Sequence, residues 1–234
     1  MITVNFNKLK IWPGYKILDI GCGSGRHTGE ALRFKGTKVV GTDINFNDLI
    51  QARERLAFQE EIGEKRGDYI LAASNITCLP FQDNYFDLVV CSEVLEHIPD
   101  HKKAVSEIIR ILKPGKNLVV SVPRYMPEQI CWLLSHEYHN NPGGHIRIYK
   151  TKELTEILTQ FGVKKWGFHW AHSLHTPYWW LKCLIGPDKE DFRVVSFYHK
   201  FLVWDMMEKP GITRFIEKLL NPLLGKSVVL YLRK

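Results

Sequence analysis

The sequence predicts an α/β protein built on a doubly wound, mostly parallel sheet. A short apolar run at residues 15–20 breaks into a glycine-rich turn, and strand-like runs then alternate with helix-like segments five times up to Val122. A continuous apolar run is typical of a buried parallel strand. Regular alternation of strands and helices is typical of a parallel sheet covered by helices.

The composition is that of an ordinary globular protein with a mildly basic balance. The chain has 234 residues, of which 45% are hydrophobic and 24% charged, enough for one α/β domain with an appendage. The formal net charge of +7 permits an acidic partner such as nucleic acid or an anionic membrane. No run of lysine and arginine stands out, so nucleic-acid binding is not expected.

The pattern of cysteines and the lack of a secretory signal pattern predict a cytoplasmic protein. The five cysteines are scattered and include no Cys-x-x-Cys pair, which indicates reduced thiols. The N-terminal residues lack the charged-then-apolar pattern of a secretory signal. No apolar stretch reaches the roughly 20 residues that a membrane-spanning helix needs.

The first turn carries glycine at every second position, Gly21, Gly23 and Gly25, with Cys22 filling the space between the first two. Glycine lets the backbone turn sharply and approach a ligand closely. The following segment can form a helix whose first N–H groups would point back at the turn. Asp19 precedes the first glycine by two residues, and its carboxylate would repel a pyrophosphate but could bind an ammonium group.

The same stretch gives the pattern apolar-x-Asp-x-Gly-x-Gly-x-Gly. This pattern resembles motif I of the class I S-adenosylmethionine (SAM) dependent methyltransferases, in the type 11 group related to quinone-pathway enzymes. The resemblance implies a Rossmann-like sheet of seven strands whose last strand lies antiparallel between the fifth and sixth. It also implies SAM as the cofactor, bound by this loop. The resemblance is close over residues 16–122 and looser up to residue 163.

The second strand ends at an acidic residue, Asp43. A carboxylate at this distance from the glycine turn is typical of a residue that accepts hydrogen bonds from both ribose hydroxyls, and the family's motif II implies the same role. The adjacent Ile44 joins the expected cofactor site. The alternative is that Asp43 caps the helical segment expected from about Phe46, although Asn45 or Asn47 could supply that cap. The second helix is expected over residues 48–65.

The third strand, at residues 69–73, precedes a stretch that resembles the family pattern acidic-x-x-x-Leu-Pro-Phe-x-Asp-x-x-Phe-Asp. Asn75 stands where the family usually has Asp, and its carbonyl could accept a hydrogen bond from the adenine amino group. The backbone N–H of Ile76 would donate to the adenine ring. The alternative is that Asn75 serves only a turn.

The fourth strand, at residues 86–91, runs into Ser92 and Glu93, beside the glycine turn. Ligands of open α/β sheets bind in this crevice. We expect Ser92 to line the cofactor. Glu93 and His145 are the candidate catalytic bases, which would take a proton from a poor nucleophile. The alternative is that His145 is a plain loop residue.

A metal-assisted mechanism is a second possibility for the same region. In the sequence Glu93-x-x-Glu96-His97, one helical turn would place the three side chains on one face. This resembles the ExxEH element of ubiquinone-pathway O-methyltransferases and small-RNA 3′-end methyltransferases, whose fourth ligand is a downstream His, here His145. In metal-free relatives the same residues cap a helix and pack. We predict no metal and keep the metal-assisted O-methyltransferase as the alternative.

The remaining chain is expected to complete the sheet and to add a cap. Residues 123–149 form an insertion rich in aromatics, and a helix follows with Thr151 as its N-cap. His169, His172 and His175 are spaced by three, but Pro177 is expected to end any helix they could share. The expected organisation is a SAM-binding methyltransferase domain (1–171), a helical insertion or cap (172–226) and a last strand returning to the sheet (227–234).

The aromatic residues of the cap leave three interpretations open: a small helical core, a cover over an apolar substrate pocket, or a surface that rests on lipid. We predict a SAM-dependent methyltransferase acting on oxygen, carbon or nitrogen of a small apolar molecule that could be lipid-like, with peripheral membrane contact as a further possibility. The alternatives are an RNA methyltransferase and a non-catalytic protein that keeps the fold.

Overall fold

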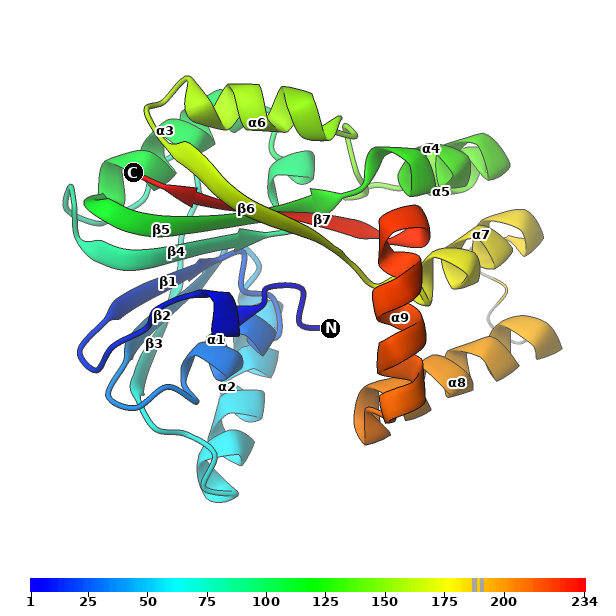
Figure 1. The fold of residues 1–234 in the computed structure, drawn as a ribbon, viewed down its shortest axis with the longest axis horizontal. Helices are drawn as coiled ribbons and strands as arrows, with labels where there is room; N and C mark the ends of the chain where they lie inside the picture. The colour runs from blue at the N-terminus through cyan, green and yellow to red at the C-terminus, as the bar shows by residue number, and fades with distance from the viewer. Residues whose placement is uncertain (187–188, 190–191) are drawn as a thin grey trace.

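The computed structural model describes residues 1–186, 189 and 192–234. Its centre is a seven-stranded sheet of order β3-β2-β1-β4-β5-β7-β6 (Figure 1). The strands are β1 (Lys16–Ile20), β2 (Lys38–Asp43), β3 (Asp68–Ala73), β4 (Phe86–Ser92), β5 (Leu112–Pro123), β6 (Lys164–Ala171) and β7 (Ser227–Arg233). Strands β1 to β5 pair in parallel, whereas β7 is antiparallel to both of its neighbours. The predicted doubly wound sheet with an antiparallel last strand is confirmed.

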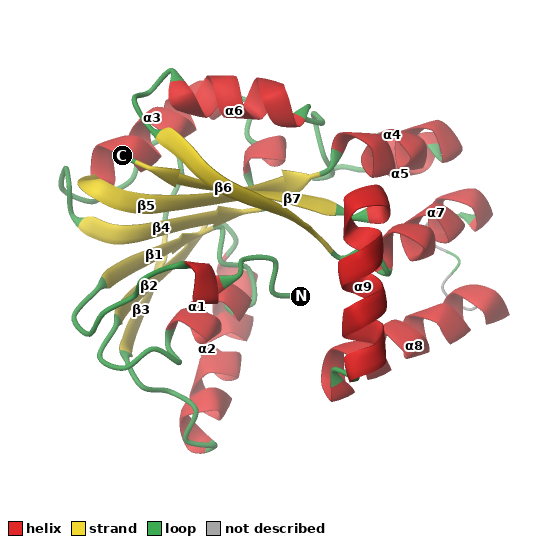
Figure 2. Cartoon of the chain, in the orientation of Figure 1, coloured by secondary structure: helices red, strands yellow, loops and turns green. Residues whose placement is uncertain are grey.

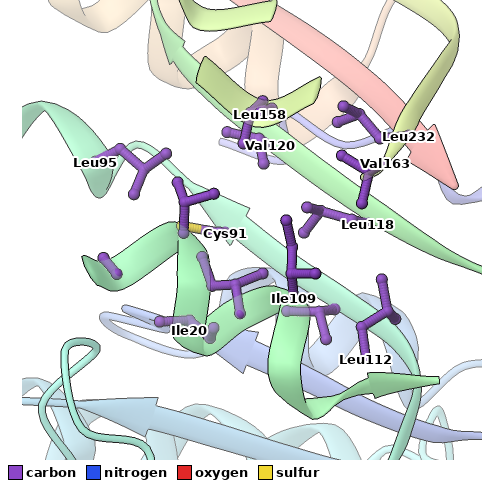
Figure 3. Close-up of a cluster of buried hydrophobic side chains, with 14 of the residues drawn as sticks. Ile20, Cys91, Leu95, Ile109, Leu112, Leu118, Val120, Leu158, Val163 and Leu232 are labelled. Atoms are coloured by element: carbon purple, nitrogen blue, oxygen red, sulfur yellow. The ribbon is translucent and has the colours of Figure 1, made fainter. Parts of the chain in front are cut away.

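Helices cover both faces of the sheet (Figure 2). Helices α1 (Arg26–Ala31) and α2 (Phe46–Glu61) lie on one face, and α3 (His101–Ile111) and α6 (Thr151–Thr159) lie on the other. An apolar cluster fills each layer. The cluster beside α3 and α6 includes Ile109, Leu118 and Leu158 (Figure 3). Strand β4 is buried along its whole length, as expected for its apolar run Leu88–Cys91.

Helix α2 begins at Phe46, as expected, because the Asn45 side chain caps it and accepts a hydrogen bond from Asn47 N at 3.0 Å. One other helix start differs from the sequence prediction. The prediction of Thr151 as the N-cap of α6 is wrong. Lys150 holds the cap position without a side-chain hydrogen bond, and Thr151 is the first helical residue.

The helices outside these layers gather beyond the carboxyl ends of the parallel strands (Figure 1). Helices α4 (Tyr125–Leu134) and α5 (His136–His139) follow β5. The predicted helices between the last two strands are α7 (His175–Ile185), α8 (Arg193–Glu208) and α9 (Gly211–Leu224). Helix α7 packs against α4, where Trp180 Nε1 donates to Pro127 O at 3.0 Å.

A small apolar cluster of Tyr178, Val195 and Leu202 joins α7 to α8. Some of the aromatic side chains around it, such as Trp179 and Phe201, therefore pack within the helical segment. None of the described helices combines the length and the apolar character needed to cross a bilayer.

Candidate active site

The glycine turn after β1 needs glycine for two different reasons. Gly21, Gly23 and Gly25 have φ angles of 63°, 50° and 75°, in the left-handed region that side chains disfavour. A Cβ on Gly21 would lie 2.4 Å from Val94 Cγ2, whereas a Cβ on Gly23 would meet no atom within 4 Å. Gly21 is therefore required for packing as well. At Gly23 the backbone borders open space that a ligand could fill.

Cys22 packs inside this turn. Its side chain is buried and lies 3.3 Å from where a Cβ on Gly41 of β2 would stand. The predicted role of Cys22 in filling space agrees with this position. Burial raises the pKa of the Cys22 thiol, with the nearby carboxylates adding to the shift, so the thiol is neutral and unreactive at ordinary pH.

Asp43 joins the tip of β2 to the glycine turn. Its Oδ2 accepts a hydrogen bond from Gly23 N at 2.9 Å, and its Oδ1 accepts one from Asn45 N at 2.9 Å. Asn45 supplies the side-chain cap of α2, so the alternative that Asp43 caps this helix is not needed. The carboxylate is half-buried at the carboxyl edge of the sheet and still has lone pairs to offer to a ligand.

Asp19 lies below the turn as a buried carboxyl group. It is only 2% exposed, and its Oδ2 accepts a hydrogen bond from Thr28 Oγ1 at 2.7 Å. Burial raises the pKa of Asp19 to about 7; the Thr28 hydrogen bond opposes this shift, and the Asp43 charge adds to it. A cationic ligand group nearby would favour the ionised form of Asp19.

The other predicted cofactor residues lie around the same edge. Ile44 is 75% exposed beside Asp43, and the side chain of Ile76 is buried in the core. Asn75 Oδ1 accepts hydrogen bonds from the Thr77 N–H and hydroxyl groups, both at 2.9 Å, so Asn75 does form a turn. Ser92 Oγ shares a hydrogen bond of 2.7 Å with Ser121 Oγ. Contacts of these residues with a cofactor stay predictions.

A group of acidic and imidazole side chains follows β4. The predicted helical turn through Glu93, Glu96 and His97 is wrong, because Glu93 has a left-handed φ of 56° and only Leu95–His97 form a short 3₁₀ turn, η2. Glu93 Oε1 accepts a hydrogen bond from Ser121 Oγ at 2.8 Å. Glu96 is fully buried, and neither of its carboxyl oxygens has a hydrogen-bond partner in the described part of the chain. Burial raises the pKa of both carboxyl groups, and the Glu93 charge raises that of Glu96 further.

His97 and His145 lie near Glu96, and the Nδ1 atom of each ring has a polar partner. His97 Nδ1 lies 3.0 Å from Gly144 O, and His145 Nδ1 lies 2.6 Å from Glu128 Oε1. The ring centroids are 5.0 Å apart. One possible ligand atom from each of Glu96, His97 and His145 lies within 4.8 Å of the others. The predicted residues Glu96, His97 and His145 are thus brought together.

Glu128 of α4 belongs to this site and was not predicted. It is 2% exposed. Burial opposes ionisation, but the hydrogen bond and charge of His145 outweigh it and hold the pKa of Glu128 below its usual range. The sequence signal was an acidic residue within the apolar run M-P-E-Q-I-C-W-L-L, but only the packing of α4 shows its partner.

This donor set fits a divalent cation in its chemistry. Metal-bound histidines usually offer one nitrogen to the ion and hold the other on a carboxylate or carbonyl, as Glu128 and Gly144 do here. The unpartnered Glu96 carboxyl would supply an oxygen ligand. Glu93 differs from the expected pattern, because Ser121 already binds its carboxylate.

A second histidine group lies near the end of β6. His172, His175 and Glu217 also approach within 4.8 Å of one another. Here Arg214 binds Glu217 at 2.8 Å, and burial together with nearby positive charge lowers the pKa of both histidines. These positive neighbours disfavour a cation. The three histidines spaced by three share no helix, since His169 lies on β6 and α7 begins at His175 with Pro177 in its first turn.

The model of a protein family described as methyltransferase domain matches residues 4–166 of this chain. The chain belongs to this family. The fold and the predicted motif I agree with that membership, and a class I SAM-dependent methyltransferase related to quinone-pathway enzymes is the assignment it supports.

Curated relatives include several C-methyltransferases. The chain is 30% identical over 177 residues to sterol 24-C-methyltransferase ERG6B of Gibberella zeae, covering 71% of this chain and 42% of that protein. It is 39% identical over 110 residues to the ubiquinone/menaquinone biosynthesis C-methyltransferase UbiE of Vibrio cholerae, covering 46% and 41%. The chain therefore spans about two fifths of the length of the curated relatives it matches.

Solved structures share the fold. A SAM-dependent methyltransferase of Methanosarcina mazei aligns with a TM-score of 0.61 and 25% identity, over 73% of this chain and 89% of that chain. The [4+2]-cyclase SpnF aligns with a TM-score of 0.59 and 20% identity, over 95% and 76%. A fold shared with a cyclase does not by itself fix the reaction, which depends on the site.

Proposed function

We propose that this protein is a SAM-dependent methyltransferase that acts on a small, apolar, lipid-like molecule. The observation that carries the proposal is the hydrogen bond from Gly23 N to Asp43 Oδ2, which joins the glycine turn to the acidic tip of β2. The carboxylates of Asp43 and of the buried Asp19 support binding of a nucleoside that carries an ammonium group, since the first could accept from the ribose and the second could favour the ammonium group.

The residues that would hold the cofactor have distinct roles. Asp43 would accept hydrogen bonds from the ribose hydroxyls. Asp19 would favour the ammonium group, and the glycine turn leaves room for the ligand beside Gly23. Ile44 would cover the adenine ring, while Asn75 and the Ile76 N–H would bind its edge. Ser92 would line the floor between these groups.

SAM supplies an electrophilic methyl group on a sulfonium, whose departure leaves a neutral thioether. The chain therefore has chiefly to align the acceptor atom with the methyl carbon. Where the acceptor needs deprotonation, Glu93 and His145 are the proposed bases. Glu128 would orient the His145 ring through the 2.6 Å hydrogen bond to Nδ1, leaving Nε2 for the acceptor.

An apolar acceptor is supported by the relatives. Several matched curated relatives are named as sterol or ubiquinone/menaquinone C-methyltransferases. A groove of about 540 Å³ lies between α2 and α8, and its lining combines apolar side chains such as Phe58 and Met206 with charged ones such as Arg55 and Asp205. A lipid-like acceptor would place the enzyme at a membrane surface facing the cytoplasm, so peripheral membrane contact is part of the proposal.

A divalent-metal-assisted O-methyltransferase is the second candidate function. The unpartnered buried carboxyl of Glu96 beside His97 and His145 favours it. These residues would hold the ion, which would lower the pKa of an acceptor hydroxyl. Methyl transfer that stops on chelation and returns with Mg²⁺ would establish this candidate. Transfer that is unchanged by chelation would leave the metal-free mechanism.

Calorimetric titration with SAM tests the proposal, with transfer from methyl-labelled SAM to extracted lipids as its second part. Micromolar binding and label in a lipid fraction are the expected results. Absence of SAM binding would favour a non-catalytic protein that keeps the fold. Label found in RNA, with binding that collapses as salt rises, would favour the RNA methyltransferase alternative.

A further inference from the structure

Helix α9 turns its polar side toward the protein and its apolar side toward solvent. Asn221 Oδ1 accepts a hydrogen bond from Ser173 N at 3.0 Å, and Thr213 is buried. Arg214 forms ion pairs with Asp205 of α8 and with Glu217. A helix packed on a water-soluble core normally does the opposite and buries its apolar stripe.

The outward side of α9 is a continuous apolar stripe with helical spacing. Phe215 is 67% exposed and Leu219 is 66% exposed. The other large apolar side chains exposed on this helix are Ile212, Ile216 and Leu223. Thr213 is the one residue of α9 that is buried. Packing within the chain therefore does not account for the apolar character of this helix.

Helix α8 adds further exposed apolar side chains. It buries Val195 and Leu202 toward α7. Its exposed apolar residues are Val194, Phe197, Val203, Trp204, Met206 and Met207. Met206 and Met207 line the groove between α2 and α8. We call the other exposed apolar residues of the two helices the α8–α9 face: Val194, Phe197, Val203 and Trp204 of α8, and Ile212, Phe215, Ile216, Leu219 and Leu223 of α9. A patch of this kind on a folded protein marks an interaction surface.

The charges around this face identify its partner. The exposed basic residues of the segment 192–226 are Arg193, Lys200, Lys209 and Lys218, together with Arg214, whose charge is already paired with Asp205 and Glu217. Its one exposed acidic residue in the described chain is Glu208. Two copies meeting symmetrically through this face would bring like charges together. Large apolar side chains flanked by lysine and arginine are typical of helices that lie in the interface of an anionic bilayer.

We propose that the α8–α9 face docks the enzyme on an anionic lipid bilayer, with α9 lying in the headgroup region. This inference deepens the proposed function, and only its statement about the acceptor rests on that function. The two helices lie beyond the carboxyl ends of the parallel strands (Figure 1). A lipid-like acceptor would enter the site from this side. Phe215 and Leu219 would enter the acyl boundary, and Lys218 would contact the headgroups.

Sedimentation with vesicles, without SAM or acceptor, tests the proposal apart from the proposed function. The native protein should pellet with vesicles of phosphatidylcholine and phosphatidylglycerol and should pellet less with phosphatidylcholine alone. Raising the salt from 0.1 to 1 M shortens the screening length from about 10 to about 3 Å and should weaken the binding. The double variant Phe215→Glu/Leu219→Glu should lower the vesicle partition coefficient by about tenfold or more.

The variant Ile70→Glu is the matched control, because Ile70 is equally exposed, at 65%, but lies on β3. It should bind vesicles as the native protein does. Circular dichroism melting confirms that each variant is folded. Native protein that stays in the supernatant would overturn the proposal, and so would a double variant that binds vesicles as well as native protein. A native dimer that the double variant dissolves, without vesicle binding, would assign the face to a second copy instead.

Discussion

Replacing Asp43 by alanine should remove most of the cofactor affinity while leaving the protein folded. Its carboxylate would accept a hydrogen bond from each ribose hydroxyl, and hydrogen bonds to a charged group contribute about 1.5–3 kcal/mol each. Losing two of them corresponds to about a hundredfold or greater loss in affinity. The variant also loses the hydrogen bonds from Gly23 N and Asn45 N, at a net cost to stability of about 1 kcal/mol each.

Isothermal titration of SAM into native and Asp43→Ala protein measures this loss directly, and urea denaturation measures the change in stability. Asp48→Ala is the matched control, because it removes the same charge from the first turn of α2. The control should bind SAM within a few-fold of the native protein. Equal affinity of native and Asp43→Ala protein, with both folded, would refute the ribose assignment.

Three further predictions concern neighbouring residues. Because the Asp19 pKa is near 7, SAM affinity of the native protein should rise between about pH 6 and 7.5 as the carboxylate forms, and Asp19→Asn should flatten this rise in calorimetric titrations. Gly21→Ala should lower the free energy of unfolding by about 2–4 kcal/mol, because it adds left-handed backbone strain and a clash with Val94. Gly23→Ala should lower it by only about 1 kcal/mol, because it adds the strain alone. Equal losses for the two variants in urea denaturation would contradict this difference in packing. The raised pKa of Glu96 means that the folded state holds its proton more tightly than the unfolded state, so without metal its contribution to stability falls as pH rises above about 4.5. Glu96→Gln should reduce this pH dependence of stability, measured by thermal melts in the presence of a chelator. An unchanged slope of melting temperature against pH would contradict the prediction.

The sheet and the glycine turn were predictable because their signals are local. The apolar run of β1, the glycine turn and the acidic tip of β2 are each encoded within a few residues, and the backbone angles of the turn explain the glycines. The fold follows from the same alternation of apolar strands and helices.

Features that depend on packing between distant segments could not be predicted. Glu128 joins the site only because α4 brings it to His145, 17 residues further along the chain. Helix α9 has an apolar stripe that would normally predict burial, yet its polar side makes the contacts with Ser173 and Asp205.

The central claim is that a SAM-like nucleoside lies across the tips of β1, β2 and β4. A crystal structure with bound S-adenosylhomocysteine tests this most directly. The account predicts the ribose on the Asp43 carboxylate, the amino group near Asp19 and the homocysteine chain over the glycine turn. A ligand bound elsewhere, or a cleft filled by the protein's own side chains, would contradict it.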